Sequence, residues 1–266
     1  MIESNSKKVT GWTVVNLLVL FATLVVNYLG SSGFFHGMGQ AAVSEKYQTL
    51  LTPNGFAFSI WGVIYTLVFA TLVTLFLKRK DPAVAKLIGW ISLPFVISSL
   101  FNMAWIVAFS YERVGLSTLF IVGILIPLMT IVHRVYNARA VMVSTLAGIA
   151  FTLYASWVFV ATILNSAIFL VQQGVDGFGI SSSVWTIIVL VVIVAVVLGY
   201  VLRYRNAVFP IAVAWAYFGI HSSYANGLIA PSMASIIQMV LLFGIAILIA
   251  LSCYTFFKNS YSIFPS

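Results

Sequence analysis

Long apolar runs recur along the whole chain, and they limit what this sequence can fold into more than any other feature. Of 266 residues, 62% are hydrophobic, and only 18 carry a charge (13 Lys and Arg with 5 Asp and Glu). A soluble domain needs about a quarter of its residues charged, so water cannot be the main solvent of this chain. Because a β-barrel would instead show alternating segments of about 10 residues, the runs predict an all-α, polytopic bundle of transmembrane helices.

Eight of these runs are candidate membrane spans. They cover about residues 11–30, 53–77, 85–109, 114–132, 141–171, 183–202, 207–220 and 232–257. The seventh is short, and its Pro210 suits the first turn of a helix, where a missing N–H group costs nothing.

The basic residues orient the eight spans. With this count, 11 of the 13 Lys and Arg fall on one side of the membrane: Lys7, Lys8, Lys78, Arg79, Lys80, Lys86, Arg134, Arg139, Arg203, Arg205 and Lys258. Only Lys46 and Arg113 fall on the other side. Since basic loops stay in the cytoplasm, both termini are expected to be cytoplasmic and the membrane to be the plasma membrane. The net charge of +8 is explained by this asymmetry, so no nucleic-acid partner is predicted.

Ionisable side chains are almost missing from the predicted spans. The acidic residues all lie outside the spans or at their ends: Glu3, Glu45, Asp81, Glu112 and Asp176. The three histidines, His36, His133 and His221, are widely separated. Proton relays, hydrolytic sites and metal sites all need clustered groups of these kinds. No catalytic or metal-binding residue is therefore predicted, and the chain is not expected to be an enzyme.

Neutral polar and aromatic residues form three stripes instead. Trp61 and Tyr65 are four residues apart, and two further sets share one helical face each: Ser98, Asn102 and Trp105, and Trp157, Ala161 and Asn165. The predicted orientation places all three stripes in the outer half of the membrane, with Trp61 about 12 Å deep at 1.5 Å per residue. Facing stripes would form a pocket for a bulky, planar, mostly apolar ligand. The alternative is ordinary helix packing or an interfacial aromatic belt.

Three of these segments resemble a known family. "TPNGFAFSIWGVIY" is similar to the start of the second helix of the TspO/MBR family, the tryptophan-rich sensory proteins that include the mitochondrial translocator protein. "LFNMAWIVAF" resembles its third helix, with Asn102 and Trp105 in place, and "YASWVFVATILN" resembles its fifth, with Trp157, Ala161 and Asn165. The resemblance covers about residues 11–169, and it departs from the family pattern at Gly55, where Trp is usual, and at Ser59, where Pro is usual.

The resemblance implies a five-helix core over residues 1–170, followed by about three additional helices in residues 171–266. It implies that Trp61, Tyr65, Asn102, Trp105, Trp157, Ala161 and Asn165 bind a tetrapyrrole such as protoporphyrin IX, or a sterol. No cofactor is required, and a bound tetrapyrrole would be a ligand. The connection at about residues 31–52 would act as a lid over the pocket, with His36 and Tyr47 in it.

The sequence leaves three functions to be compared. The first is a ligand-binding membrane sensor of TspO type, whose partners are membrane lipid, a hydrophobic small molecule, and either a second copy of the chain or an unidentified protein. The second is a transporter of a small hydrophobic molecule, with a second polar site formed by Pro210, Trp215, His221, Tyr224 and Asn226. The third is an enzyme acting on a bound chromophore, for which the sequence offers no reactive group.

Overall fold

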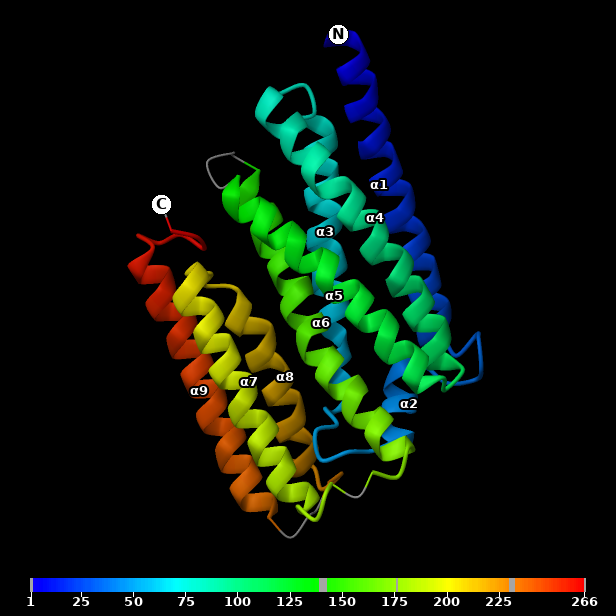
Figure 1. Cartoon of the computed structure of the whole chain (residues 1–266), viewed down its shortest axis with the longest axis vertical. Coiled ribbons are helices and arrows are strands. Elements are labelled where there is room, and N and C mark those ends of the chain that lie inside the picture. Colours follow the sequence, from blue (N-terminus) through cyan, green and yellow to red (C-terminus); the bar gives the residue numbers. More distant parts are fainter. Residues whose placement is uncertain (1, 139–142, 176, 230–232, 266) are drawn as a thin grey trace. The chain divides into compact units, whose positions relative to one another are not determined.

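The computed structural model describes residues 2–138, 143–175, 177–229 and 233–265, and over these residues the chain forms helices and no strands (Figure 1). The α-helices are α1 (Ile2–Ser31), α2 (Gln40–Lys46), α3 (Ile60–Leu77), α4 (Pro82–Ser110), α5 (Val114–Asn137), α6 (Ser144–Gln172), α7 (Ser182–Tyr204), α8 (Phe209–Ala225) and α9 (Ala234–Lys258). One 3₁₀ helix, η1 (Gly55–Ser59), precedes α3. Four residues that bound or orient the predicted spans lie outside the described residues: Arg139, Val141, Asp176 and Ser232.

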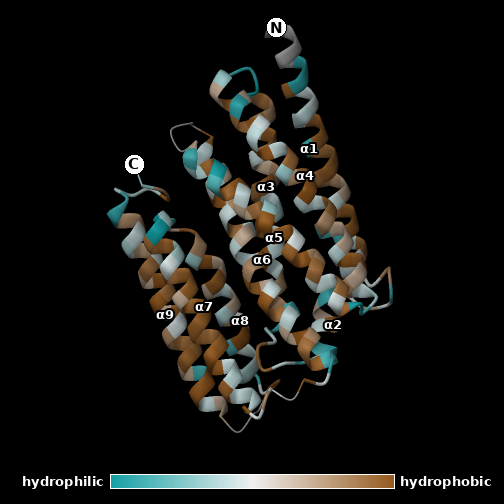
Figure 2. Cartoon of the chain, viewed as in Figure 1, coloured by the Kyte–Doolittle hydropathy of each residue, from teal (hydrophilic) through white to brown (hydrophobic). Residues whose placement is uncertain are grey.

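In the described part of the chain, seven helices are long and apolar enough to cross a membrane, and they match seven of the eight predicted spans. The predicted all-helical, polytopic bundle is therefore confirmed. The remaining predicted span, the seventh along the chain, corresponds to α8. This helix has 17 residues, which is the lower limit for a span. It begins with Pro210 in its first turn, as predicted. In Figure 2, brown apolar residues fill the helices and teal polar residues gather near the helix ends.

The second span begins at Gly55, two residues after the predicted Pro53. Its first turn is the 3₁₀ helix η1, and α3 begins at Ile60. Tertiary hydrogen bonds hold the preceding turn in the 3₁₀ form. The backbone N–H of Asn54 donates to the carbonyl of Gly219 over 2.9 Å, and the indole Nε1 of Trp215 donates to the carbonyl of Ala57 over 2.9 Å. An α-helix begun at Pro53 would use the carbonyl of Ala57 internally, and it would leave the N–H of Asn54, in its first turn, without an intrahelical partner.

Two compact units make up the fold, and the chain passes between them more than once. Unit 1 contains residues 1–40 and 60–158, and unit 2 contains residues 41–59 and 159–266. The segment that carries α2 and η1 thus belongs with α7, α8 and α9, although it lies between α1 and α3 in the sequence.

In unit 1, α4 is the central helix and packs against both α1 and α5 (Figure 1). Its start is capped by Asp81, whose side chain accepts hydrogen bonds from the backbone N–H groups of Ala83 and Val84 at 2.8 and 3.3 Å, while Pro82 occupies the first turn. Between α1 and α4, Asn16 donates to the Ser92 hydroxyl over 2.8 Å.

In unit 2, α8 packs against α9, α7 and η1. Most of its residues are buried although it is the shortest of the long helices. Two glycines allow this close approach. A Cβ atom on Gly219 of α8 would lie 2.7 Å from the Cβ of Ala57, and one on Gly244 of α9 would lie 2.6 Å from the Tyr217 ring. The short seventh span is therefore the core helix of its unit.

Candidate functional site

Five aromatic rings from α3, α4 and α6 meet inside unit 1. Trp61, in the first turn of α3, is at their centre: its ring centroid lies 5.3 Å from Tyr65, 5.6 Å from Tyr154, and 6.3 Å from both Trp105 and Trp157. The Trp61 and Tyr65 rings are stacked, whereas Tyr154 and Trp157 meet Trp61 edge to face. These are the favoured geometries for aromatic pairs. We call these five residues the aromatic cluster.

Asn102 of α4 connects this cluster by hydrogen bonds. Its Oδ1 accepts from Nδ2 of Asn27 on α1 over 2.7 Å and from the Tyr65 hydroxyl over 3.5 Å. Its Nδ2 donates to the Tyr154 hydroxyl over 3.2 Å. Side chains from α1, α3, α4 and α6 therefore share one neutral polar network, centred on a fully buried amide.

Burial differs across the aromatic cluster. Tyr65, Trp105, Tyr154 and Trp157 are all buried, but Trp61 is only partly buried. Of the five rings, Trp61 is therefore the one that can move or stack on an incoming molecule with the least loss of packing. Neutral amides and hydroxyls at this depth can orient a ligand by hydrogen bonds, while the rings supply flat apolar walls.

The structure brings together five of the seven predicted ligand-binding residues: Trp61, Tyr65, Asn102, Trp105 and Trp157. Ala161 and Asn165 lie one and two turns after Trp157 on α6 and belong to unit 2. Sequence analysis missed Asn27 and Tyr154. Tyr154 could have been found from its position three residues before Trp157, and Asn27 from being a lone amide near the outer end of an apolar span.

Comparison with family models identifies the group to which the chain is related. Residues 13–254 match the family described as "TSPO-like protein", which is most of the chain and includes both units. The chain belongs to the TSPO-like family. Comparison with curated proteins and with solved structures gives no significant match. Family membership and the apolar helices together make this chain an integral, multi-pass membrane protein of TspO type.

The predicted lid of this TSPO-like protein contains a helix and is divided between the units. His36 lies in unit 1, with its ring centroid 5.3 Å from that of Tyr111 just after α4. Tyr47 lies in unit 2, where the Lys46 ammonium is 5.6 Å from its ring centroid. The two predicted lid residues therefore belong to different units, and their function as a lid stays a prediction.

Two of the residues predicted for a second site in α8 donate side-chain hydrogen bonds to backbone carbonyls. The Trp215 indole donates to Ala57, and the Tyr224 hydroxyl donates to the carbonyl of Leu50 over 2.7 Å. Asn226 caps the end of α8 and donates to the Ser222 hydroxyl over 3.3 Å. Trp215 and Tyr224 thus hold residues 50 and 57 against α8, which is a structural role. In the described part of this TSPO-like chain, His, Cys, Asp and Glu side chains form no group of three suited to a metal ion.

Proposed function

We propose that this TSPO-like protein binds a bulky, planar, hydrophobic ligand of tetrapyrrole or sterol type at the aromatic cluster, in the half of the membrane predicted to be outer. One observation carries the proposal: four aromatic rings lie around Trp61, two of them hydrogen-bond to the buried amide of Asn102, and Trp61 is the least buried of the five. Family membership and the apolar helices support a membrane receptor with this location.

When the ligand binds, the rings would exchange contacts among themselves for contacts with the flat faces of the ligand. Offset-stacked and edge-to-face aromatic pairs contribute about 0.5–1.5 kcal/mol each beyond burial. Stacking of a planar ligand on the rings can therefore offset the free energy lost when ring–ring contacts within the cluster break. A ligand hydroxyl or carboxylate at Asn102 would take the place of one hydrogen bond of the network. The protein supplies shape and hydrogen bonds, and no group of the cluster is a strong acid, base or nucleophile.

Protoporphyrin IX, titrated against the detergent-purified protein while Trp fluorescence is followed, tests this proposal. We expect saturable quenching, with a dissociation constant raised about tenfold or more by Trp61→Leu because a stacking surface worth more than 1.4 kcal/mol is lost. Trp185→Leu is the matched control, since that Trp lies at the start of α7 in unit 2. Quenching that never saturates, or equal dissociation constants for both variants, would sink the proposal for this ligand class.

Transport is the alternative function that the sequence analysis carried forward. A flux assay separates the two: proteoliposomes of a binding-competent protein are loaded with the same porphyrin, and its release is timed. Release at the rate of protein-free liposomes favours a sensor or receptor, whereas protein-dependent release that Trp61→Leu abolishes favours a transporter.

A further inference from the structure

A groove between α4 and α5 of unit 1 is separate in its residues from the aromatic cluster. It encloses about 470 Å³. Its walls are mostly apolar, with Leu93, Ile97 and Phe101 from α4 and Ile126 from α5. Leu93 and Ile126 are more than half exposed, so in a membrane this part of the groove faces lipid. None of its lining residues is acidic.

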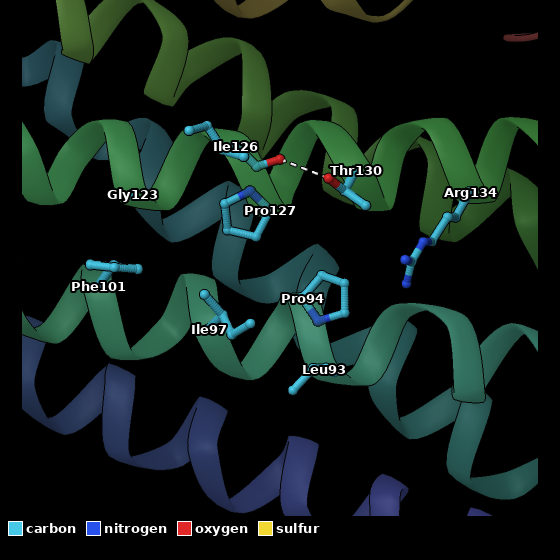
Figure 3. A pocket seen from close by; sticks show the side chains of 9 residues that line it. All are labelled: Leu93, Pro94, Ile97, Phe101, Gly123, Ile126, Pro127, Thr130 and Arg134. Atoms are coloured by element: carbon cyan, nitrogen blue, oxygen red, sulfur yellow. Dashed lines mark hydrogen bonds between the residues drawn. The ribbon is translucent and has the colours of Figure 1, made fainter.

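Two prolines and a glycine form this groove. Pro94 lies inside α4 and Pro127 inside α5, and Figure 3 shows both rings turned toward the space between the two helices. Gly123 leaves room for the Phe101 ring at one end, where an added Cβ would lie 2.8 Å from that ring. A proline ring cannot donate a helical hydrogen bond, so each proline also leaves the carbonyl four residues earlier without its usual donor.

A cation uses one of these freed carbonyls. The guanidinium of Arg134 donates from α5 to the carbonyl of Trp90, the residue four before Pro94. On the same residue, the Lys86 ammonium lies 4.9 Å from the Trp90 ring centroid. Trp90 therefore contacts Arg134 through its backbone carbonyl and Lys86 through its ring. An Arg side chain has five donors, and this bond uses one of them.

The groove has the length and polarity of one lipid in one leaflet. From Arg134 to Gly123 is 11 residues, or roughly 16 Å at 1.5 Å per residue, and half of a bilayer core is about 15 Å thick. The charged end lies toward the side predicted to be cytoplasmic, where anionic lipids are attracted to basic residues and pockets between helices hold their headgroups.

We propose that this groove binds one anionic phospholipid of the cytoplasmic leaflet. One acyl chain lies along the apolar walls between Pro94 and Pro127, and the phosphate contacts the guanidinium of Arg134 and the ammonium of Lys86. The planar guanidinium matches a phosphate with two parallel donors. Charge complementarity selects this occupant over a neutral lipid, because the lining offers positive charge and no carboxylate to balance it.

Native mass spectrometry of the full chain in neutral detergent tests the proposal. Phosphatidylglycerol and phosphatidylcholine with the same acyl chains are added in equal amounts, and the ratio of the two bound lipids is measured. We expect phosphatidylglycerol to be preferred. Lys86→Gln should lower the preference about fivefold and Arg134→Gln about tenfold or more, as expected for losing one cation near a headgroup and one charged hydrogen-bond donor.

Two further variants keep the test decisive if Arg134→Gln does not fold. Ile126→Trp fills the groove but leaves both cations, and it should reduce binding of both lipids. Arg203→Gln removes an exposed cation from the last turn of α7, on the same predicted side, and should leave the preference unchanged. An equal loss in Arg203→Gln and Lys86→Gln would overturn the proposal, because general surface charge would then explain it. Displacement of bound lipid by glycerol phosphate, which has no acyl chain, would also overturn it.

Discussion

The two units differ in most of the hydrogen bonds by which side chains join segments far apart in the sequence. In unit 1, the amides and hydroxyls of Asn27, Asn102 and Tyr154 bond to one another. In unit 2, side chains bond to backbone carbonyls: Trp215 to Ala57, Tyr217 to Leu190 over 2.5 Å, Tyr224 to Leu50, and Ser252 to Ala207 over 2.5 Å. A bond to the backbone fixes a segment, whereas side chains that bond to each other can exchange a partner for a ligand. The difference marks unit 1 as the adaptable part and unit 2 as the fixed part.

The largest expected effect is a loss of stability in the fixed part, unit 2. Gly219→Ala places a Cβ 2.7 Å from the Cβ of Ala57 and 3.2 Å from that of Pro53, and such overpacking costs about 1–3 kcal/mol of unfolding free energy. We expect a lower unfolding temperature in detergent. Gly199→Ala on α7 is the matched control, because its Cβ would have no atom within 4 Å and alanine favours helix. Equal unfolding temperatures for both variants would contradict the close approach of α8 to η1.

A smaller effect is expected when one backbone bond of unit 2 is removed. Trp215→Phe keeps a ring beside Phe56 and Phe218 but deletes the donor to Ala57, which is worth about 1 kcal/mol. Amide hydrogen exchange of residues 54–59 should speed up about fivefold in consequence. Trp185→Phe is the control, since it deletes an indole bond to the carbonyl of Gly177. Exchange at 54–59 that responds equally to both variants would rule out a local effect.

The smallest effect concerns the adaptable part. A double-mutant cycle of Asn27→Ala and Asn102→Ala should give a coupling energy of about 0.6 kcal/mol, the average for such pairs in membranes. Adding the ligand should reduce this coupling, because the ligand competes for the Asn102 amide. Asn16 and Ser92, which join the same two helices, form the control cycle, whose coupling should not change. A ligand that changes both cycles alike would act on helix packing rather than on Asn102.

Sequence patterns predicted the parts of this structure that depend on local periodicity. Apolar run length predicted the spans, and the spacing of Trp61 with Tyr65 and of Asn102 with Trp105 predicted stripes that the structure brings together. The family resemblance is confirmed, while ligand binding at these residues stays a prediction. The 3₁₀ turn before α3 was missed because Trp215 and Gly219, more than 150 residues later, determine it. Asn27 is visible in the sequence as an amide near the outer end of an apolar span, but its partner, Asn102, lies 75 residues later.

Unit 2 is assembled from distant parts of the chain, and this has a consequence for biogenesis. The partners of residues 48–57 lie in and just after α8, with separations of 158 residues for Trp215 and Ala57, 174 for Tyr224 and Leu50, and 180 for Gln48 and Leu228. At a synthesis rate of 5–20 residues per second, a ribosome needs roughly 10–30 s to supply them. During that interval the turn before α3 has neither its indole donor nor its core helix. A nascent chain that stops before α8 would therefore present an unfinished turn to the insertion machinery and its quality control.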